Sequence, residues 1–248
     1  MRQYIAENHV KKAVIIGMGY IGLEMCEALR ELGMAVEMVK PRPKLLPWME
    51  TSMADVVKAE LEAHEVGVPL GPAVENIAMK GDRLILSVPA LTLEADLVLV
   101  AVGISPASEL AVAAGLQTSV QNAIAVDARQ RTADKHIYAA GDCADAFHVV
   151  TGKRTWIPLA LRANRAGWAV ADNVCGIDRR LTGLVGSAVF KVFDLQVART
   201  GLNMAEASDV GFEAESVTIK SRSRAHAHPG ASTIYVHMVG DRGSGRLL

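Results

Sequence analysis

Three glycines near the start of the chain, Gly17, Gly19 and Gly22, have the spacing of a turn that receives a nucleotide pyrophosphate. The β-branched run at 13–16 predicts a buried strand before them, and apolar residues at helical spacing predict a helix over 20–32. The first glycine would permit the tight turn, the second a close approach of backbone to pyrophosphate, and the third helix–strand packing. The helix would offer unpaired N–H groups to the anion. A glycine turn that only packs is the less favoured alternative.

The residue after the next predicted strand, 34–39, bears on the choice between NADH and NADPH. An acidic side chain at this place would accept the ribose hydroxyls and repel a 2′-phosphate. The chain instead has Lys40, followed by Arg42 and Lys44, and this positive charge predicts a preference for NADPH. Glu37, inside the strand, is an alternative partner for the ribose, and a solvated basic loop is the other interpretation.

The rest of the first hundred residues completes one nucleotide-binding domain. Thr51 or Ser52 is expected to cap a helix that runs to about residue 64. A core strand is expected over 96–102, and Gly103 ends it. Alternating apolar residues predict an antiparallel meander over 74–79, 84–88 and 91–94.

Past Pro106 the pattern of expected elements changes. Helices are expected over 108–114 and 159–174, with Pro158 in the first turn of the second, where its missing N–H would have no helical partner. Strands are expected over 123–126, 137–140, 188–200, 214–220 and 232–239, the second of them ending at Gly141 and Asp142.

Composition limits the classes of protein to consider. Half of the 248 residues are apolar but only 4% are aromatic, which is typical of an α/β protein with buried, aliphatic parallel strands. The net charge of −1 argues against a broad nucleic-acid surface. Neither a signal-peptide core nor a membrane-spanning apolar run is present, so a cytoplasmic location is expected. Cys26, Cys143 and Cys175 form no CxxC pair, so packing is their expected role.

Several motifs follow one another in order along the chain: Gly-Met-Gly-Tyr-Ile-Gly-Leu-Glu at 17–24, Ala-Val-Gly-Ile-Ser-Pro at 101–106, Thr-Ala-Asp-Lys-His-Ile-Tyr-Ala-Ala-Gly-Asp at 132–142, and further segments at 150–160, 171–173, 191–195 and 200–203. Together they resemble the pyridine nucleotide-disulfide oxidoreductase family, closest to its CoA-disulfide reductase and NADH oxidase branch. The similarity covers essentially the whole chain.

The resemblance implies an α/β fold in three parts. These are a Rossmann-like NAD(P)-binding domain with an antiparallel meander at 1–105, the C-terminal half of an FAD-binding domain at 106–182, and a truncated α+β dimerisation domain at 183–248. It also implies a fragment, because the family's first FAD half, with its redox-active cysteine, would precede residue 1.

The same resemblance assigns two catalytic residues and a flavin contact. Tyr20 would be the tyrosine that lies over the flavin until the nicotinamide displaces it, and Glu24 the glutamate that reaches toward the nicotinamide side of the flavin. Asp142, after Gly141, would accept hydrogen bonds from the ribityl hydroxyls of FAD. The alternatives are a structural tyrosine, a solvated glutamate and an aspartate that only caps its turn.

In this family the start of the helix over 159–174 faces the flavin, and its partial positive charge would stabilise an anionic reduced flavin. Asn164 would lie near a CoA pocket. Arg162 and Arg165 could meet CoA phosphates, but a solvent-facing position is the favoured expectation for both. The cofactor-contacting residues that the motifs imply are Gly17, Gly19, Gly22, Lys40, Gly103, Gly141, Asp142, Pro158, Leu159 and Ala160.

The resemblance implies FAD and NAD(P)H as cofactors of a homodimeric enzyme. Such an enzyme passes a hydride from nicotinamide to flavin, and electrons then reach a disulfide, a persulfide or oxygen. Ala227 and His228 stand where the family often has tyrosines, a departure from a CoA-disulfide reductase. No metal site is expected, since His226 and His228 are only a loop pair. A stand-alone nucleotide-binding or redox-sensing module is the alternative. A simple Rossmann dehydrogenase is disfavoured, because no substrate domain with an acid–base residue follows.

Overall fold

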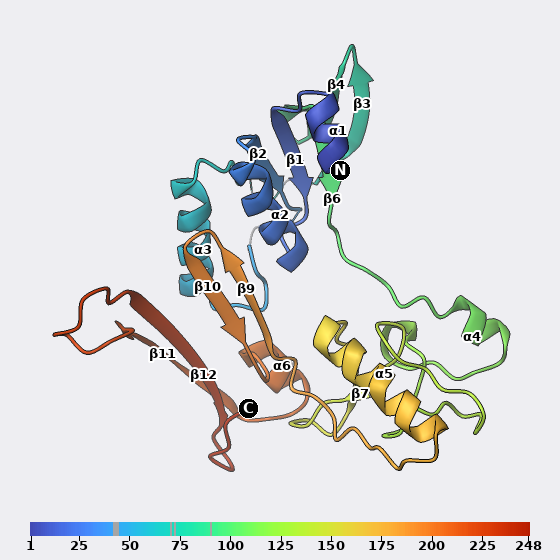
Figure 1. The fold of residues 1–248 in the computed structure, drawn as a ribbon. Helices are drawn as coiled ribbons and strands as arrows, with labels where there is room; N and C mark the ends of the chain where they lie inside the picture. Colours follow the sequence, from blue (N-terminus) through green and yellow to red (C-terminus); the bar gives the residue numbers. More distant parts are fainter. Residues whose placement is uncertain (42–44, 70, 72, 90) are drawn as a thin grey trace. The chain divides into compact units, whose positions relative to one another are not determined.

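The structure is a computed structural model that describes residues 1–248 except 42–44, 70, 72 and 90 (Figure 1). The chain forms two compact units. The first comprises residues 1–103, 189–198 and 217–237, and the second comprises 104–188, 199–216 and 238–248.

The first unit is built on a parallel sheet with the strand order β2-β1-β6. The strands predicted around the glycine motif are confirmed, and the returning strand is shorter than the expected 96–102. In Figure 1 these strands lie beside the first long helix. The strands are β1 (Lys12–Ile16), β2 (Ala35–Val39) and β6 (Leu97–Val100).

Two apolar clusters cover the two faces of this sheet, because successive side chains of a strand point to opposite sides. Ile15 and Met38 join a cluster with α2 (Tyr20–Glu31) and α3 (Thr51–Ala63). Val14 joins the other cluster, with the predicted antiparallel meander. The meander strands are β3 (Asn76–Lys80), β4 (Arg83–Val88) and β5 (Leu91–Ala95), and a short helix, α1 (Arg2–Glu7), precedes β1.

The capping of α3 differs from the prediction. Glu50 is the residue that precedes the helix, and its side chain makes no cap hydrogen bond. Thr51 and Ser52 both lie inside the first turn, so the expected cap by either hydroxyl is wrong.

Two hairpins follow later in the chain. The strand expected over 188–200 is two strands, β9 (Ala188–Val192) and β10 (Leu195–Arg199), because Phe193 adopts a φ of 51° and reverses the chain. The expectations for 214–220 and 232–239 are confirmed by β11 (Ala214–Arg222) and β12 (Thr233–Asp241).

The second unit has little regular structure apart from one long helix. Its elements are α4 (Glu109–Ala113), the 3-10 turn η1 (Val120–Asn122), β7 (Ala146–Phe147), β8 (Arg154–Thr155), α5 (Ala160–Val174) and α6 (Met204–Asp209). Leu159 is the N-cap of α5. Pro158 therefore precedes the helix, and its expected place in the first turn is wrong.

The strands predicted over 123–126 and 137–140 are wrong. Ile124 makes single bridges to Thr118 and Ala144, and Tyr138 makes one to Arg131. A β-branched run becomes a strand only when a neighbour supplies a continuous ladder, and the described residues supply isolated pairs here. The prediction that Asp142 ends a strand fails for the same reason.

Candidate functional site

The glycine turn between β1 and α2 is shaped by close backbone contacts. Gly17 has a φ of 110°, and a Cβ on it would collide with the carbonyl oxygen of Ala101. A Cβ on Gly22 would collide with the carbonyl oxygen of Gly17. Both positions therefore require glycine for the fold alone.

At position 19, neither a close contact nor the backbone conformation requires glycine. Its φ of −83° and ψ of −174° are open to any residue, and no atom lies within 4 Å of where its Cβ would be. It is exposed, and it is the N-cap of α2 without a side-chain cap. The first N–H groups of this helix are thus left for a ligand, and a side chain at Gly19 would stand in the approach to them.

Tyr20 and Glu24 lie on α2, which starts at this turn. The ring of Tyr20 packs against Phe190 at 5.1 Å and Trp48 at 6.3 Å between centroids. Glu24 is exposed, and within the described residues no hydrogen bond or ion pair engages its carboxylate. The structure thus brings Tyr20 to the glycine turn and leaves Glu24 open to solvent.

The positive charges expected beyond β2 are only partly described. Lys40 follows β2 directly, and its ammonium donates a hydrogen bond to the carbonyl oxygen of Leu45. Arg42 and Lys44 lie outside the described residues. Glu37 is paired with Lys12 at 2.6 Å from within the strand, so its carboxylate is already compensated.

Gly103 and Gly141 both have positive φ, at 115° and 91°, a conformation that favours glycine. No atom lies within 4 Å of either Cβ position. The two turns are therefore shaped by the backbone conformation that glycine allows.

Asp142 lies in a turn that is fixed through its main chain. Its carbonyl oxygen accepts a hydrogen bond from the Trp156 indole at 2.7 Å. Arg162 donates to the carbonyl oxygens of Gly141 and Asp145 on either side. The carboxylate of Asp142 is exposed and makes no hydrogen bond or ion pair with the described residues, although its charge acts on nearby Arg162. The turn therefore presents an acceptor on a fixed backbone.

Asp145 anchors the far end of this turn. Its side chain is fully buried and accepts hydrogen bonds from the Val126 N–H at 2.9 Å, from Ser119 and from Arg154. A buried carboxylate is tolerated when its oxygens are paired in this way. The expectation that Arg162 faces solvent is wrong, since burial holds the pKa of its guanidinium below the usual value. Arg165 is exposed, as expected.

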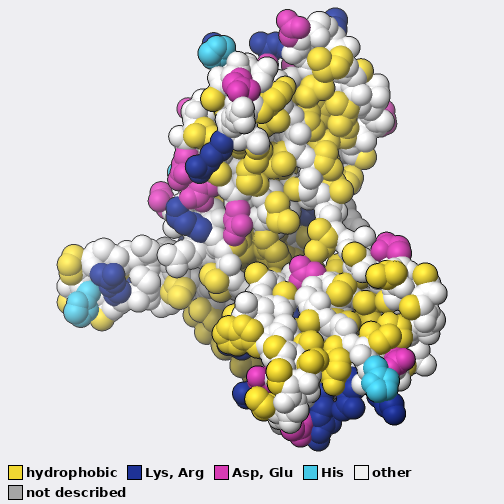
Figure 2. All heavy atoms as spheres, turned by 45° about the vertical axis from the view of Figure 1, so that its right-hand side comes forward, with side chains coloured by type: hydrophobic (Ala, Val, Ile, Leu, Met, Phe, Trp, Pro, Cys, Tyr) yellow, Lys and Arg dark blue, Asp and Glu magenta, His cyan; other side chains and the backbone are white. Residues whose placement is uncertain are grey.

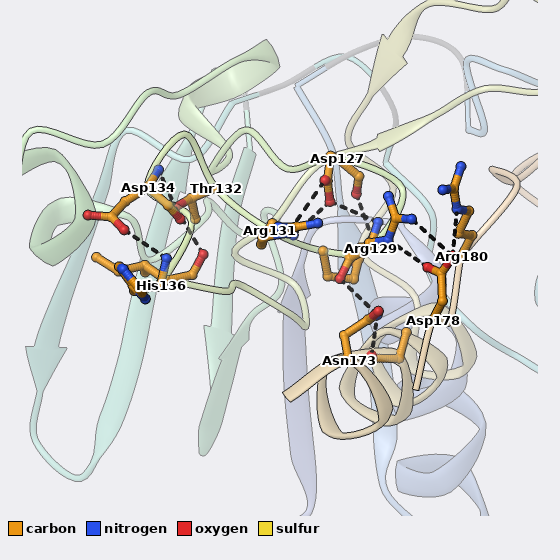
Figure 3. Close-up of polar contacts among 12 residues, drawn as sticks. Asp127, Arg129, Arg131, Thr132, Asp134, His136, Asn173, Asp178 and Arg180 are labelled. Carbon is orange, nitrogen blue, oxygen red and sulfur yellow. Dashed lines mark hydrogen bonds and ion pairs between the residues drawn. The ribbon is translucent and has the colours of Figure 1, made fainter. Parts of the chain in front are cut away.

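The segment before this turn is fastened to α5 by a polar network that the sequence did not indicate (Figure 3). Asn173 donates to the carbonyl oxygens of Ala169, Arg129 and Arg179. Arg129 pairs with Asp178 at 2.6 Å. The donors and acceptors named here are paired with one another, and the network holds the backbone of this segment in place.

The start of α5 carries the remaining predicted residues. Leu159 caps the helix in an extended conformation without a side-chain hydrogen bond, and Ala160 is the first helical residue. The first N–H groups of this 15-residue helix are therefore uncapped by side chains. Asn164 is exposed one turn further on.

The cysteines are unpaired, and Cys26 is inert. Burial raises the pKa of the Cys26 thiol to about 12, so it stays protonated and packs as expected. Cys143 is half-buried and donates to the carbonyl oxygen of Ala140 at 3.3 Å. Cys175 is exposed, so the packing role expected for it is wrong.

Three potential metal ligands meet beside β9 and β10. The ligand atoms of Glu60, His64 and Asp194 lie within 4.8 Å of one another. These groups already interact, because Glu60 accepts a hydrogen bond from the Asp194 N–H at 2.8 Å and Nδ1 of His64 lies 3.0 Å from the Glu60 carbonyl. The cluster fastens the hairpin to α3. Nowhere in the described part of the chain do His226 and His228 gain a third ligand.

Comparison with known proteins places these features in a family. Residues 1–167 match the model of the pyridine nucleotide-disulphide oxidoreductases. An NAD(P)H sulfur oxidoreductase (CoA-dependent) of Pyrococcus abyssi is 34% identical over 249 residues, which are 100% of this chain and 56% of the relative. The chain thus spans about half the length of the curated relatives it matches.

Solved structures agree with this match. A NAD-dependent persulfide reductase from A. fulgidus superposes with a TM-score of 0.95 at 36% identity, over 100% of this chain and 46% of that one. An engineered water-forming NADPH oxidase, derived from the Lactobacillus brevis NADH oxidase, superposes with a TM-score of 0.92 at 26% identity, over 99% and 55%.

None of the helices among the described residues is both long and apolar enough to span a membrane.

The family match and the solved structures cover both the parallel sheet with its glycine turn and meander and the turn at Asp142 with the start of the helix after it. The chain belongs to the pyridine nucleotide-disulphide oxidoreductases.

Proposed function

We propose that this chain supplies the NAD(P)H-binding part and part of the FAD-binding part of a flavin-dependent NAD(P)H oxidoreductase. The observation that carries the proposal is Gly19, whose lack of a side chain is explained neither by packing nor by backbone conformation. A pyrophosphate that approaches the start of α2 supplies the explanation.

The residues present fit both cofactors. When bound, the nicotinamide supplies two electrons and a proton equivalent, and the flavin accepts them. The glycine turn and the α2 N–H groups hold the pyrophosphate of NAD(P)H, with Tyr20 and Glu24 on its nicotinamide side. Asp142 accepts hydrogen bonds from ribityl hydroxyls, and the uncapped start of α5 offers positive potential to the flavin.

The coenzyme is proposed to be NADPH in preference to NADH. Lys40 stands where an acidic residue would repel a 2′-phosphate. The engineered NADPH oxidase supports the assignment, because its five substitutions include replacement of an aspartate by alanine and introduction of two arginines. Affinities of the purified chain for the two coenzymes test it, and tighter binding of NADH would refute it.

The electron acceptor of the whole protein is proposed to be a persulfide, a small disulfide or oxygen, the classes named in the relatives. Exposed Asn164 remains the proposed contact to a CoA-bearing substrate. The three free cysteines suit the reducing cytoplasm, where we place the protein.

A homodimer through β11 and β12 is part of the proposal. Thr218 and His237 meet on one face of this hairpin at 2.8 Å. Alternation along the strands puts Val217 and Ile219 on the opposite face, and these are 50% and 44% exposed. A second copy of the chain would cover these two side chains of the hairpin. Figure 2 shows that hydrophobic side chains are also exposed over other parts of the surface.

The substitution Gly19→Ala tests nucleotide binding. A methyl group there fits the fold, so the thermal midpoint should stay within a few degrees of wild type. Affinity for NADPH should fall about ten- to hundredfold, the loss expected when charge-assisted hydrogen bonds to the pyrophosphate are disturbed. Isothermal titration calorimetry measures the affinity.

Gly167→Ala is the matched control, since Gly167 also has open space at its Cβ position but lies in α5. It should bind NADPH as wild type does. Equal NADPH affinity of Gly19→Ala and wild type would contradict the proposed function.

A further inference from the structure

One histidine and two carboxylates meet where the turn between β9 and β10 lies on α3. Glu60 is in the last turn of α3 and His64 is the C-cap residue of this helix, a spacing that puts both side chains on one face. Asp194 belongs to the hairpin turn. One ligand atom from each of the three lies within 4.8 Å of the other two. Imidazole nitrogen and carboxylate oxygen are both ligands of Zn²⁺ in proteins.

The imidazole of His64 is oriented for metal binding. Its Nδ1 lies 3.0 Å from the carbonyl oxygen of Glu60, and a carbonyl oxygen only accepts, so Nδ1 carries the proton. The lone pair of the neutral ring is then on Nε2, which lies 4.0 Å from Oδ2 of Asp194. Metal-bound histidines commonly donate their other ring N–H to such a carbonyl. Phe193 stacks on the ring at 4.0 Å with the planes 5° apart, which fixes its orientation.

The two carboxylates give this cluster a negative charge. One oxygen of Glu60 accepts the Asp194 N–H at 2.8 Å, and the described residues make no hydrogen bond or ion pair with the second oxygen. The ammonium of Lys191 on the same hairpin is paired with Glu27 at 2.5 Å. The side chain of Asp194 is 94% exposed, so it can turn toward the imidazole. Zinc bonds of about 2.0–2.2 Å put ligand atoms about 3.4 Å apart, which a small rotation of Asp194 achieves.

We propose that Glu60, His64 and Asp194 bind a divalent transition metal of the zinc class, with water in the remaining position, and that the ion joins the β9–β10 hairpin to α3. The imidazole ligand favours Zn²⁺ over Mg²⁺ and Ca²⁺, which prefer oxygen ligands. Glu60 and Asp194 are 134 residues apart, so no metal-binding motif marks the site in the sequence. The inference is independent of the proposed function, because none of the three residues is assigned to a cofactor.

Calorimetric titration of the full chain with Zn²⁺, without nucleotide, tests this site. Wild type should bind Zn²⁺, and the ion should raise its thermal midpoint, because a ligand of the folded chain stabilises that state. Asp194→Asn removes one charged ligand but keeps the N–H that bonds to Glu60. Its Zn²⁺ affinity should fall at least about tenfold, the loss seen even for outer contacts of a metal site, with the metal-free thermal midpoint unchanged. His64→Gln should lose at least as much affinity.

Glu62→Gln is the matched control, because Glu62 is an exposed carboxylate of the same helix that pairs with Lys58 at 3.2 Å. It should bind Zn²⁺ as wild type does. Failure of wild type to bind Zn²⁺, or wild-type affinity in Asp194→Asn, would overturn the inference. An equal loss in Glu62→Gln would also overturn it, since the general charge of α3 would then attract the ion. If His64→Gln does not fold, the exposed Asp194 still decides the result.

Mg²⁺ is the second probe. Zn²⁺ should bind Asp194→Asn more weakly than wild type, and a large excess of Mg²⁺ should leave Zn²⁺ binding to wild type unchanged. Displacement of Zn²⁺ by Mg²⁺ would overturn the assignment to the zinc class. Because no nucleotide is present in these titrations, their outcome is separate from that of the NADPH titrations of Gly19→Ala, which test the proposed function.

Discussion

Lys40 is the single described residue on which the coenzyme preference depends. It directly follows β2, and its ammonium bonds to the carbonyl oxygen of Leu45. Lys40→Asp should weaken NADPH and strengthen NADH, because the new carboxylate would accept ribose hydroxyls and repel a 2′-phosphate. The NADPH/NADH affinity ratio should fall at least about tenfold, as measured by calorimetry.

Lys80→Asp makes the same change of charge on the exposed meander strand β3 and should leave this ratio as it is. If Lys80→Asp lowered the ratio as much as Lys40→Asp, net charge rather than a local contact would set the preference.

At this scale the sequence predicted positions that depend on neighbours along the chain and missed those that depend on distant ones. Gly22 is needed where the spacing placed it because its Cβ would meet Gly17 of the same turn, and Gly17 because the turn gives it a φ of 110°. The further clash of a Gly17 Cβ with distant Ala101 was not visible in the sequence. Arg162 was expected in solvent and instead donates to carbonyl oxygens 21 and 17 residues earlier. Main-chain acceptors in an irregular turn leave no pattern in the sequence.

Among the elements, β1 is joined to the start of β6 by one carboxylate. Asp96 accepts hydrogen bonds from the N–H groups of Lys11 at 3.0 Å and Lys12 at 2.9 Å. The bond from Lys11, followed by that from Lys12, holds the pKa of Asp96 below its usual value. The ionised Asp96 carboxylate therefore stabilises the folded protein above about pH 4, the pKa of Asp in the unfolded chain. This stabilisation is lost as the pH falls through the lower pKa that Asp96 has in the folded protein.

Urea unfolding of wild type and Asp96→Asn at several pH values tests this linkage. Asparagine keeps an acceptor oxygen but does not titrate. Wild type should be the more stable protein at pH 7, and the difference should shrink steadily below pH 4. A difference that is constant from pH 7 to pH 3 would show that ionisation of Asp96 does not stabilise the fold.

The elements that the sequence predicted are those with a local signature. Hydrophobic periodicity and bounding glycines within each segment indicated the parallel strands, α2, α3 and the meander. The hairpin of β9 and β10 was merged into one strand, and its attachment to α2 joins Glu27 to Lys191, 164 residues apart. Such a pairing follows from tertiary packing and has no periodic signal.

For the whole molecule, the proposed dimer predicts that one face of β11 and β12 is sensitive to charge. Val217→Asp would bury a carboxylate between two copies and should weaken association at least about tenfold, because an unpaired buried charge is costly. Size-exclusion chromatography with light scattering over a concentration series measures this.

Thr218→Asp places the same charge on the neighbouring residue, which meets His237 on the other face, and should leave the dimer intact. A monomeric wild type, or equal dissociation of the two variants, would rule out this face as the interface.

Glu27 has a role beyond holding the hairpin of β9 and β10. Glu27 lies on α2, whose first residue follows Gly19. This single helix therefore connects the proposed anion-binding turn with the hairpin. If a nucleotide binds more tightly when the hairpin is attached to α2, the two equilibria are coupled. The bound nucleotide must then stabilise the attachment of the hairpin by the same free energy. Binding of the coenzyme would then reversibly stabilise the attachment of a segment that lies more than 160 residues away in sequence.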